Sequence, residues 1–243
     1  MQSWGLTDPG CVRKQNQDAF RIEHLDKKTL LCVVCDGMGG AKSGNIASTL
    51  AVEVFVEEIR RTWTSTMDQE KTDQILRSAV KLANFTVYDQ AVQFEEFDGM
   101  GTTLVAALIQ GRRATIVNVG DSRCYGIDPD GIQQITKDHS LVQLMVDRGE
   151  LTPEVAKNYP GKNFITRAIG TEPFVMSDIF HVEVARGDFL LLCSDGLSNV
   201  MDDQEILFEV AHGVNKQHCC QRLLNIAVSR GAPDNVTSVL AMV

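Results

Sequence analysis

Short apolar runs bounded by glycine, proline and charged residues recur along the chain, and they predict a protein rich in β-strands. The clearest run covers residues 29–35, where every position is apolar or β-branched. Such a run is typical of a strand that is buried on both faces. Further strands are predicted at residues 4–6, 19–23, 103–109, 114–119, 123–127, 179–184, 189–193 and 236–242.

Two longer segments repeat apolar residues at helical spacing instead. The first covers residues 43–61, and its predicted apolar side carries Ile46, Leu50 and Val54 with Ala47, Ala51 and Phe55 beside them. The second covers residues 68–93, and its predicted inner side carries Ile75, Ala79, Leu82 and Val87. Shorter helices are predicted at residues 140–147, 204–211 and 218–228.

Residues 149–170 follow neither pattern. Pro153, Pro160 and Gly161 interrupt this stretch, so we expect a mobile excursion rather than a regular element. Elsewhere the strands are joined by hairpin-length connections, which favours an α+β protein. With 243 residues, of which 44% are hydrophobic and 23% charged, the chain can bury one substantial core, and we expect a single domain over residues 1–243.

Charge and hydropathy exclude several classes of partner. The net charge of −9 and the pI near 5.0 argue against nucleic acid, which requires a basic face to displace counterions. No apolar run approaches the ~20 residues of a membrane helix, and the N-terminal residues do not resemble a signal peptide. We therefore expect a cytoplasmic protein that does not bind membranes.

The seven cysteines are scattered along the chain. Cys32 and Cys35 form a C-x-x-C pair, but residues three apart on a strand point to opposite faces, which makes a zinc clip or a redox pair improbable. The sequence instead favours buried free thiols in a reducing compartment.

Four aspartates, each followed by a small or turn-forming residue, carry the strongest chemical signal. They are Asp36, Asp121, Asp195 and Asp234, and three of them follow strand-like apolar runs. Any one of them could simply close a strand as a turn residue. Four such aspartates together favour a different interpretation, in which neighbouring strand ends place the carboxylates side by side. Such an arrangement forms an oxygen-only site, which suits hard divalent cations. A metal-activated hydrolase is the function that this pattern predicts.

The order and spacing of the motifs resemble the metal-dependent protein phosphatases of type 2C, and in particular their bacterial members. The motifs are Thr7-Asp8-Pro9-Gly10, Arg13 with Asn16-Gln17-Asp18, Asp36-Gly37-Met38-Gly39-Gly40, Gly101-Thr102-Thr103, Gly120-Asp121-Ser122-Arg123, Asp138-His139-Ser140, Ile165-Thr166-Arg167-Ala168-Ile169-Gly170, Ser194-Asp195-Gly196-Leu197 and Asp234-Asn235-Val236-Thr237. The resemblance implies a four-layer sandwich of two antiparallel β-sheets flanked by α-helix pairs, with metals at one end. Residues 149–170 would then form a flap beside the active site.

The same resemblance implies the site residues. It places metal ligands or their supports at Asp36, Gly37, Asp195, Asp234, Asp121 and Asp18. Asp36 would bridge two Mg²⁺ or Mn²⁺ ions, and Asp195 and Asp234 would complete the first metal's protein ligands. The Gly37 carbonyl would serve the second, Asp18 would orient a metal-bound water, and Asp121 with Asp195 would hold a third, weaker metal. Mg²⁺ and Mn²⁺ both accept such oxygen ligands.

The substrate phosphate is expected to meet Arg13, whose guanidinium can bind two phosphate oxygens at once. An ordinary exposed arginine is the alternative interpretation. Met38 departs from the family pattern, because many relatives have a histidine there that is proposed to protonate the leaving group; Ala41 stands where some bacterial members place one. A metal-bound water or another donor must serve. His139 is more simply a structural hydrogen-bonding residue.

The leading functional hypothesis is hydrolysis of phosphoserine and phosphothreonine in proteins by a metal-bridging hydroxide. The expected partners are phosphoprotein substrates and a cognate bacterial Ser/Thr kinase whose action the protein opposes, and we expect a monomer. Alternatives are a dedicated phosphatase of a stress or sporulation regulator and a non-catalytic binding module of the same fold. A nucleotide-binding protein is the least favoured, because the glycines after Asp36 do not complete a phosphate-binding loop.

Overall fold

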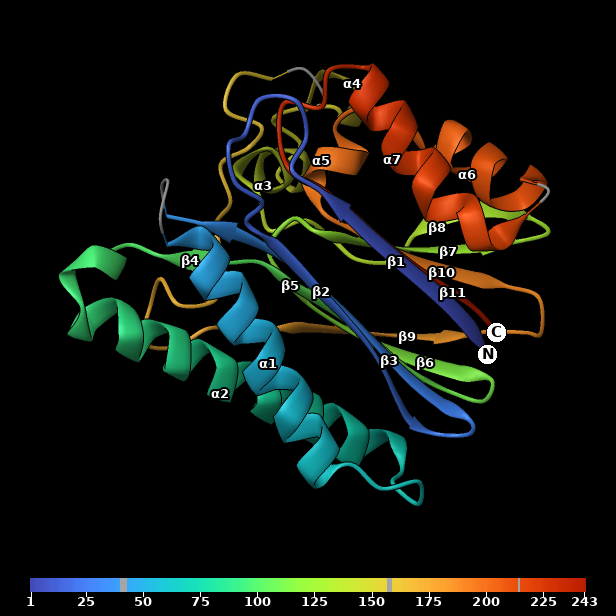
Figure 1. Ribbon diagram of the computed structural model, residues 1–243, viewed down its shortest axis with the longest axis horizontal. Coiled ribbons are helices and arrows are strands. Elements are labelled where there is room, and N and C mark those ends of the chain that lie inside the picture. Colours follow the sequence, from blue (N-terminus) through green and yellow to red (C-terminus); the bar gives the residue numbers. More distant parts are fainter. Residues whose placement is uncertain (40–42, 157–158, 214) are drawn as a thin grey trace.

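Two antiparallel β-sheets form the centre of the protein, as the computed structural model in Figure 1 shows. The structure describes residues 1–39, 43–156, 159–213 and 215–243. The first sheet has the strand order β1 (Gln2–Asp8), β11 (Val236–Met242), β10 (Phe189–Cys193), β7 (Arg123–Asp128) and β8 (Gly131–Gln134). The second has the order β2 (Asp18–Asp26), β3 (Thr29–Met38), β5 (Leu104–Gln110), β6 (Arg113–Val119) and β9 (Asp178–Glu183), and β4 (Gly101–Thr102) pairs with β3.

Helix pairs cover the outer faces of the two sheets, so the molecule has four layers (Figure 1). Helices α1 (Gly44–Thr62) and α2 (Gln69–Gln93) pack on the second sheet, and α6 (Asp203–His212) and α7 (Cys219–Ser229) pack on the first. A third apolar cluster fills the space between the sheets. The predicted α+β sandwich is therefore confirmed. No helix in the described part of the chain is long and apolar enough to cross a membrane.

Local sequence explains where the helices begin. The Asp68 side chain accepts a hydrogen bond from the Lys71 N–H at the start of α2, and Asp202 and Glu205 form a reciprocal capping box at the start of α6. Several short elements are not predicted by the apolar pattern, because each is too brief or too polar to show a period. They are β4, β8, η1 (Glu95–Phe97), α4 (Pro153–Ala156), α5 (Asp195–Ser198) and η2 (Lys216–His218).

The predicted inner side of α2 is partly wrong. Leu82 is 41% exposed, and Phe85, three residues further along the helix, is 60% exposed. The buried residues are Thr72, Leu76, Ala79, Val80, Ala83, Asn84, Val87 and Ala91, a stripe that contacts the sheet and α1. Leu82 and Phe85 lie outside this stripe, since α2 is an outer layer with solvent on its far side.

The cysteines follow the strand geometry expected of them. Cys32 lies in the cluster between the sheets and Cys35 in the cluster under α1 and α2, so the two thiols face opposite sides of β3. All seven cysteines are free, and burial raises the pKa of Cys32 to about 12. Cys11 is exposed, which corrects the expectation that every thiol is buried.

Strand register brings the predicted site residues to one end of the sandwich. The end of β3 lies beside the start of β2, where Asp36 faces Asp18, and the end of β6 lies beside the start of β5. The end of β10 lies between β7 and the start of β11, because Cys193 pairs with Arg123 on one side and Ser238 on the other. Consequently Asp36 near the end of β3, Asp195 at the start of α5, and Asp121 and Asp234 in connecting segments all lie at this end.

Candidate active site

Asp36 is held at the end of β3 by two threonines. Its backbone N–H donates to Thr103 Oγ1 at 2.9 Å, and its carbonyl oxygen accepts from the Thr103 N–H and the Thr102 hydroxyl, each at 2.9 Å. The Thr103 hydroxyl is also 2.7 Å from the Ser122 hydroxyl, next to Asp121. The Gly-Thr-Thr motif therefore fixes the Asp36 backbone and ties it to the Asp121 turn.

Asp18 lies directly across from Asp36 and is buried. Its Oδ2 accepts hydrogen bonds from the Ser194 hydroxyl at 2.7 Å and the Thr237 hydroxyl at 2.6 Å. Its Oδ1 is buried and has no partner among the described residues. Burial raises the pKa of Asp18 to about 6, although the two hydroxyl bonds act in the other direction.

Asp195 begins the short helix α5, where its Oδ2 accepts from the Asn199 amide at 2.9 Å. Its Oδ1, like that of Asp18, is buried without a partner in the described part of the chain. Burial and the charge of Asp234 raise the Asp195 pKa, and burial with the charge of Asp195 raises the pKa of Asp121 to about 8. Burial and the neighbouring carboxylates hold the Asp36 pKa well above its usual range. This pattern shows carboxylates that repel one another in a poorly solvated place.

Arg13 and Asp234 contact each other directly. Arg13 Nη2 lies 2.8 Å from Asp234 Oδ2, and the other carboxylate oxygen accepts from the Asn235 N–H at 2.9 Å. The Arg13 side chain is 52% exposed, so it lies at the rim of the site. Arg13, which is predicted to bind phosphate, thus forms an ion pair with Asp234, which is predicted to bind metal.

Gly37 is required by packing. A Cβ at this position would lie 2.0 Å from the Gly44 carbonyl oxygen and 2.6 Å from that of Gln17. Its N–H donates to the same Gln17 oxygen at 3.1 Å. The close approach of three backbone segments therefore explains the glycine, whether or not its carbonyl binds a cation. Met38 and Gly39 follow along the cleft, whereas Gly40 and Ala41 lie outside the described residues.

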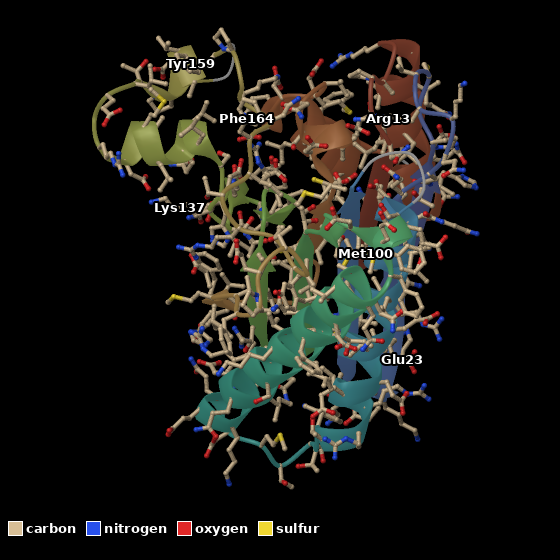
Figure 2. All side chains as sticks on the ribbon, turned by 90° about the vertical axis from the view of Figure 1, so that its left-hand side faces the viewer. Arg13, Glu23, Met100, Lys137, Tyr159 and Phe164 are labelled. Carbon is tan, nitrogen blue, oxygen red and sulfur yellow. The ribbon has the colours of Figure 1, made fainter. Side chains whose placement is uncertain are left out.

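These residues surround one cleft of about 830 Å³. Its lining includes Arg13, Asp36, Gly37, Asp121, Asp195 and Asp234, together with Asn163 and Ile165 from the predicted flap. Asp18 is not on this surface. Figure 2 shows Arg13 and Phe164, a residue of the predicted flap, at the same end of the molecule, with Glu23 of β2 further along its length.

The predicted flap includes the short helix α4 and is anchored at its base. The Leu141 N–H, at the start of α3 (Leu141–Asp147), donates to the Phe164 carbonyl at 2.8 Å, and the Thr166 N–H donates to the His139 carbonyl at 2.7 Å. Residues 157 and 158 lie outside the described residues.

His139 is a structural residue in this arrangement. Its Nδ1 accepts from the Gly120 N–H at 3.1 Å, so the proton of the neutral ring is on Nε2, which lies 3.2 Å from Asp178 Oδ2. Arg167 Nη1 donates to the other Asp178 oxygen at 2.9 Å. Burial lowers the His139 pKa, which favours this neutral form. The ring joins the segment at Gly120 and Asp121 to Asp178 at the start of β9.

The donor set fits hard divalent cations, because the carboxylates offer only oxygen and two of their oxygens are buried without partners. The described residues hold no group of three or more Asp, Glu, His or Cys side chains already arranged as metal ligands. One reason is that the Asp234 carboxylate is paired with Arg13. Metal binding would therefore require side chains to rotate, although the backbone already places these residues around one cleft.

A carboxylate-lined cleft at one end of an α/β/β/α sandwich defines a class of metal-dependent hydrolases, and comparison with known proteins agrees. The family described as protein phosphatase 2C matches residues 12–226. The "Serine/threonine phosphatase stp" of Listeria innocua is 36% identical over 96% of this chain and 92% of its own. The chain belongs to the protein phosphatase 2C family.

Solved structures have the same fold. The serine/threonine phosphatase Stp1 from Staphylococcus aureus is 36% identical, with a TM-score of 0.94 over 100% of this chain and 94% of that one. The catalytic domain of the serine/threonine protein phosphatase PstP, solved in complex with two manganese ions, is 33% identical, with a TM-score of 0.85 over 99% of this chain and 97% of that one. The likeness covers every layer of the sandwich.

Proposed function

We propose that the cleft at the end of the sandwich hydrolyses phosphoserine and phosphothreonine esters in proteins. By its family the protein is an enzyme, a protein-serine/threonine phosphatase. The observation that carries the proposal is the convergence of four aspartates, from four separate segments of the chain, on a cleft with Arg13 at its rim. A non-catalytic binding module would not need to bury these mutually repelling carboxylates.

Two Mg²⁺ or Mn²⁺ ions are the proposed cofactors. Asp36 would contact both ions, Asp195 and Asp234 would hold the first, and the Gly37 carbonyl would bind the second. Asp18, which does not line the cleft, would support the site from its buried position beside Asp36. Asp121 with Asp195 would hold a third, weaker ion. The unpartnered oxygens of Asp18 and Asp195 support this assignment, as do the two manganese ions of the related PstP structure. When bound, such ions would supply a nucleophile at neutral pH and positive charge at the phosphoryl oxygens.

The residues of the chain would then orient the substrate. Arg13 would turn from Asp234 to the phosphate, where its planar guanidinium can donate to two oxygens at once. Asn163 and Ile165 would bound the substrate on the flap side. Met38 has no proton to give to a leaving alkoxide, and the Nε2 proton of His139 is engaged with Asp178. Neither residue is the general acid in this proposal.

The proposed partners are phosphoproteins and the Ser/Thr kinase whose products this enzyme reverses. We propose a monomer that acts in the cytoplasm as one domain over residues 1–243, with residues 149–170 as its flap. The net charge of −9 supports the absence of nucleic acid among its ligands. Because phosphoproteins are often acidic too, attraction of substrate would depend on local positive charge at Arg13 and the bound cations.

Hydrolysis of p-nitrophenyl phosphate and of a phosphothreonine peptide, with Mn²⁺ and then with EDTA, tests the proposal. We expect both substrates to be hydrolysed with Mn²⁺ and neither with EDTA. Asp36→Asn should lose at least about two orders of magnitude in kcat at saturating Mn²⁺, the scale of removing a charge-stabilising group. Activity of Asp36→Asn within about tenfold of wild type would contradict the assignment of Asp36.

A further inference from the structure

A chain of hydrogen bonds runs from the surface strand β1 to the buried carboxylate of Asp18. The Asn16 amide donates to Thr7 Oγ1 at 2.8 Å, the Thr7 and Thr237 hydroxyls are 2.7 Å apart, and the Thr237 hydroxyl donates to Asp18 Oδ2 at 2.6 Å. Ser194 donates to the same Oδ2 at 2.7 Å. Thr7 and Thr237 are directly paired across β1 and β11, so the strand register builds this chain.

The direction of every bond in the chain follows from the number of protons available. Thr237 has one hydroxyl proton, and it is given to Asp18. Thr7 must therefore be the donor in its bond with Thr237, and it accepts in turn from the Asn16 amide. The Asn16 orientation is fixed as well, because its Oδ1 accepts from the Asp18 N–H at 3.1 Å. Ser194 is fixed in the same way, since its Oγ accepts from the Thr237 N–H at 3.0 Å while it donates to Asp18.

The two hydroxyls of Ser194 and Thr237 converge on one oxygen of Asp18. Oδ2 receives both hydroxyls, whereas Oδ1 is buried and has no partner among the described residues. A carboxylate held by two donors on one side cannot rotate without losing both bonds in a place where water does not replace them. The chain thus keeps Oδ2 occupied and leaves Oδ1 as the oxygen available for other chemistry.

We propose that Thr237, supported by Thr7 and Asn16, is a positioning residue that orients Asp18 so that Oδ1 serves the metal centre beside Asp36. This inference rests on the proposed function, because it deepens the role of Asp18 there. Thr237 is fully buried, and valine has nearly the same shape as threonine, so packing alone does not require a hydroxyl at this position. A buried hydroxyl is costly unless bonded, so its presence at this position is accounted for by the bond to Asp18.

Paired substitutions at Thr237 separate this role from packing. Thr237→Val keeps the shape and removes the hydroxyl, whereas Thr237→Ser keeps the hydroxyl and removes a methyl group. We expect Thr237→Val to weaken Mn²⁺ binding, measured by calorimetry, by about tenfold or more, the scale seen when a group that orients a metal ligand is lost. Thr237→Ser should recover most of that loss. Melting in EDTA checks that both variants fold.

Thr115→Val is the matched control. Thr115 is a buried threonine on β6 that pairs with His181, away from the cleft, so its replacement should leave Mn²⁺ affinity unchanged.

Thr7→Val tests the hydrogen-bond chain one step further out, at a residue without a direct contact to Asp18. It should weaken Mn²⁺ binding in the same direction but by less than Thr237→Val, and it serves as the principal test should Thr237→Val not fold.

The outcomes distinguish the inference from the proposed function. Wild-type Mn²⁺ affinity in both Thr237→Val and Thr7→Val would overturn the positioning role. Equal losses in Thr237→Val and Thr237→Ser would also overturn it, because shape rather than the hydroxyl would then be responsible. Calorimetry reports these results even if the wild-type protein hydrolyses no phosphopeptide, an outcome that would instead reject the proposed function.

Discussion

Arg13 Nη2 lies 2.8 Å from Asp234 Oδ2, although the two residues are 221 positions apart in the chain. The contact joins the residue proposed to bind phosphate to a residue proposed to bind metal. A cation that takes Asp234 Oδ2 would weaken this ion pair and free the guanidinium for substrate. Metal binding and phosphate binding are therefore expected to support each other through the exchange of one carboxylate oxygen.

Arg13→Ala should raise KM for a phosphothreonine peptide by roughly tenfold to a hundredfold, since hydrogen bonds to charged groups contribute about 1.5–3 kcal/mol. Mn²⁺ affinity, measured by calorimetry, should stay near wild type or become tighter, because the competitor for Asp234 is gone. Arg13→Lys is the matched variant, which keeps the charge but not the planar fork, and it should recover KM only in part. An unchanged KM in Arg13→Ala would remove this residue from the substrate site.

Metal-free protein should become more stable as the pH falls from 8 to 6.5. The pKa of Asp121 is about 8 and that of Asp18 about 6 in the folded state, both well above the ordinary value of an aspartate carboxyl. The folded state therefore binds more protons than the unfolded state in this window, and stability increases by about 1.4 kcal/mol per pH unit for each proton taken up. Thermal melting in EDTA at a series of pH values measures the effect.

Bound Mn²⁺ should reverse this pH dependence, because protons then compete with the cation for the same oxygens. Asp121→Asn in EDTA is the control, and it should melt at a higher temperature than wild type at pH 8. Below pH 6.5 the lowered pKa of His139 acts in the opposite direction, since the unfolded state then binds the extra proton. A melting temperature in EDTA that is flat or falls between pH 8 and 6.5 would show that the aspartates do not repel one another as described.

Asp121→Ala tests the third cation separately. Two tight Mn²⁺ ions should still bind, because Asp36, Asp195 and Asp234 remain, but turnover should fall or the metal-activation curve should shift to higher concentration. Calorimetric stoichiometry and activity as a function of Mn²⁺ concentration measure the two effects. Full activity with an unshifted curve would make Asp121 a turn residue only, a role that its place after Gly120, at φ +108°, would also explain.

The sequence predicts most of the strands, and the place of the aspartates near strand ends, because both depend on local pattern. The run at 29–35 is apolar throughout and forms β3, and Asp36 follows it directly. The polar strand β8 is missed because Gly131–Gln134 carries one apolar residue and shows no alternation. The exposure of Leu82 depends on which side of α2 meets the sheet, and helical spacing alone does not determine that.

Contacts between segments that are distant in the chain are the part of the site that local sequence pattern cannot predict. The Asp-Asn-Val-Thr motif draws attention to Asp234, yet Thr237 contacts Asp18 from 219 positions away, and only the pairing of β11 with β1 brings Thr7 to it. The Arg13 contact with Asp234 arises in the same way. Such pairs follow from strand register, which the structure supplies and a single sequence does not.

The last prediction concerns protonation of the leaving group, where Met38 lines the cleft and has no proton to donate. Met38→His should help phosphoserine and phosphothreonine peptides more than p-nitrophenyl phosphate, because an alkoxide is far more basic than p-nitrophenolate. General acid catalysis contributes roughly 10²–10⁴-fold where it is fully operative, so an imperfectly placed histidine should still produce a measurable change in the ratio of the two kcat/KM values.

His139→Ala should lower both rates to a similar extent, because the ring holds the Gly120 N–H and Asp178 rather than the substrate. Melting of His139→Ala in EDTA would report the loss of this tether. A selective loss of peptide hydrolysis in that variant, with p-nitrophenyl phosphate and stability unaffected, would instead identify His139 as the acid.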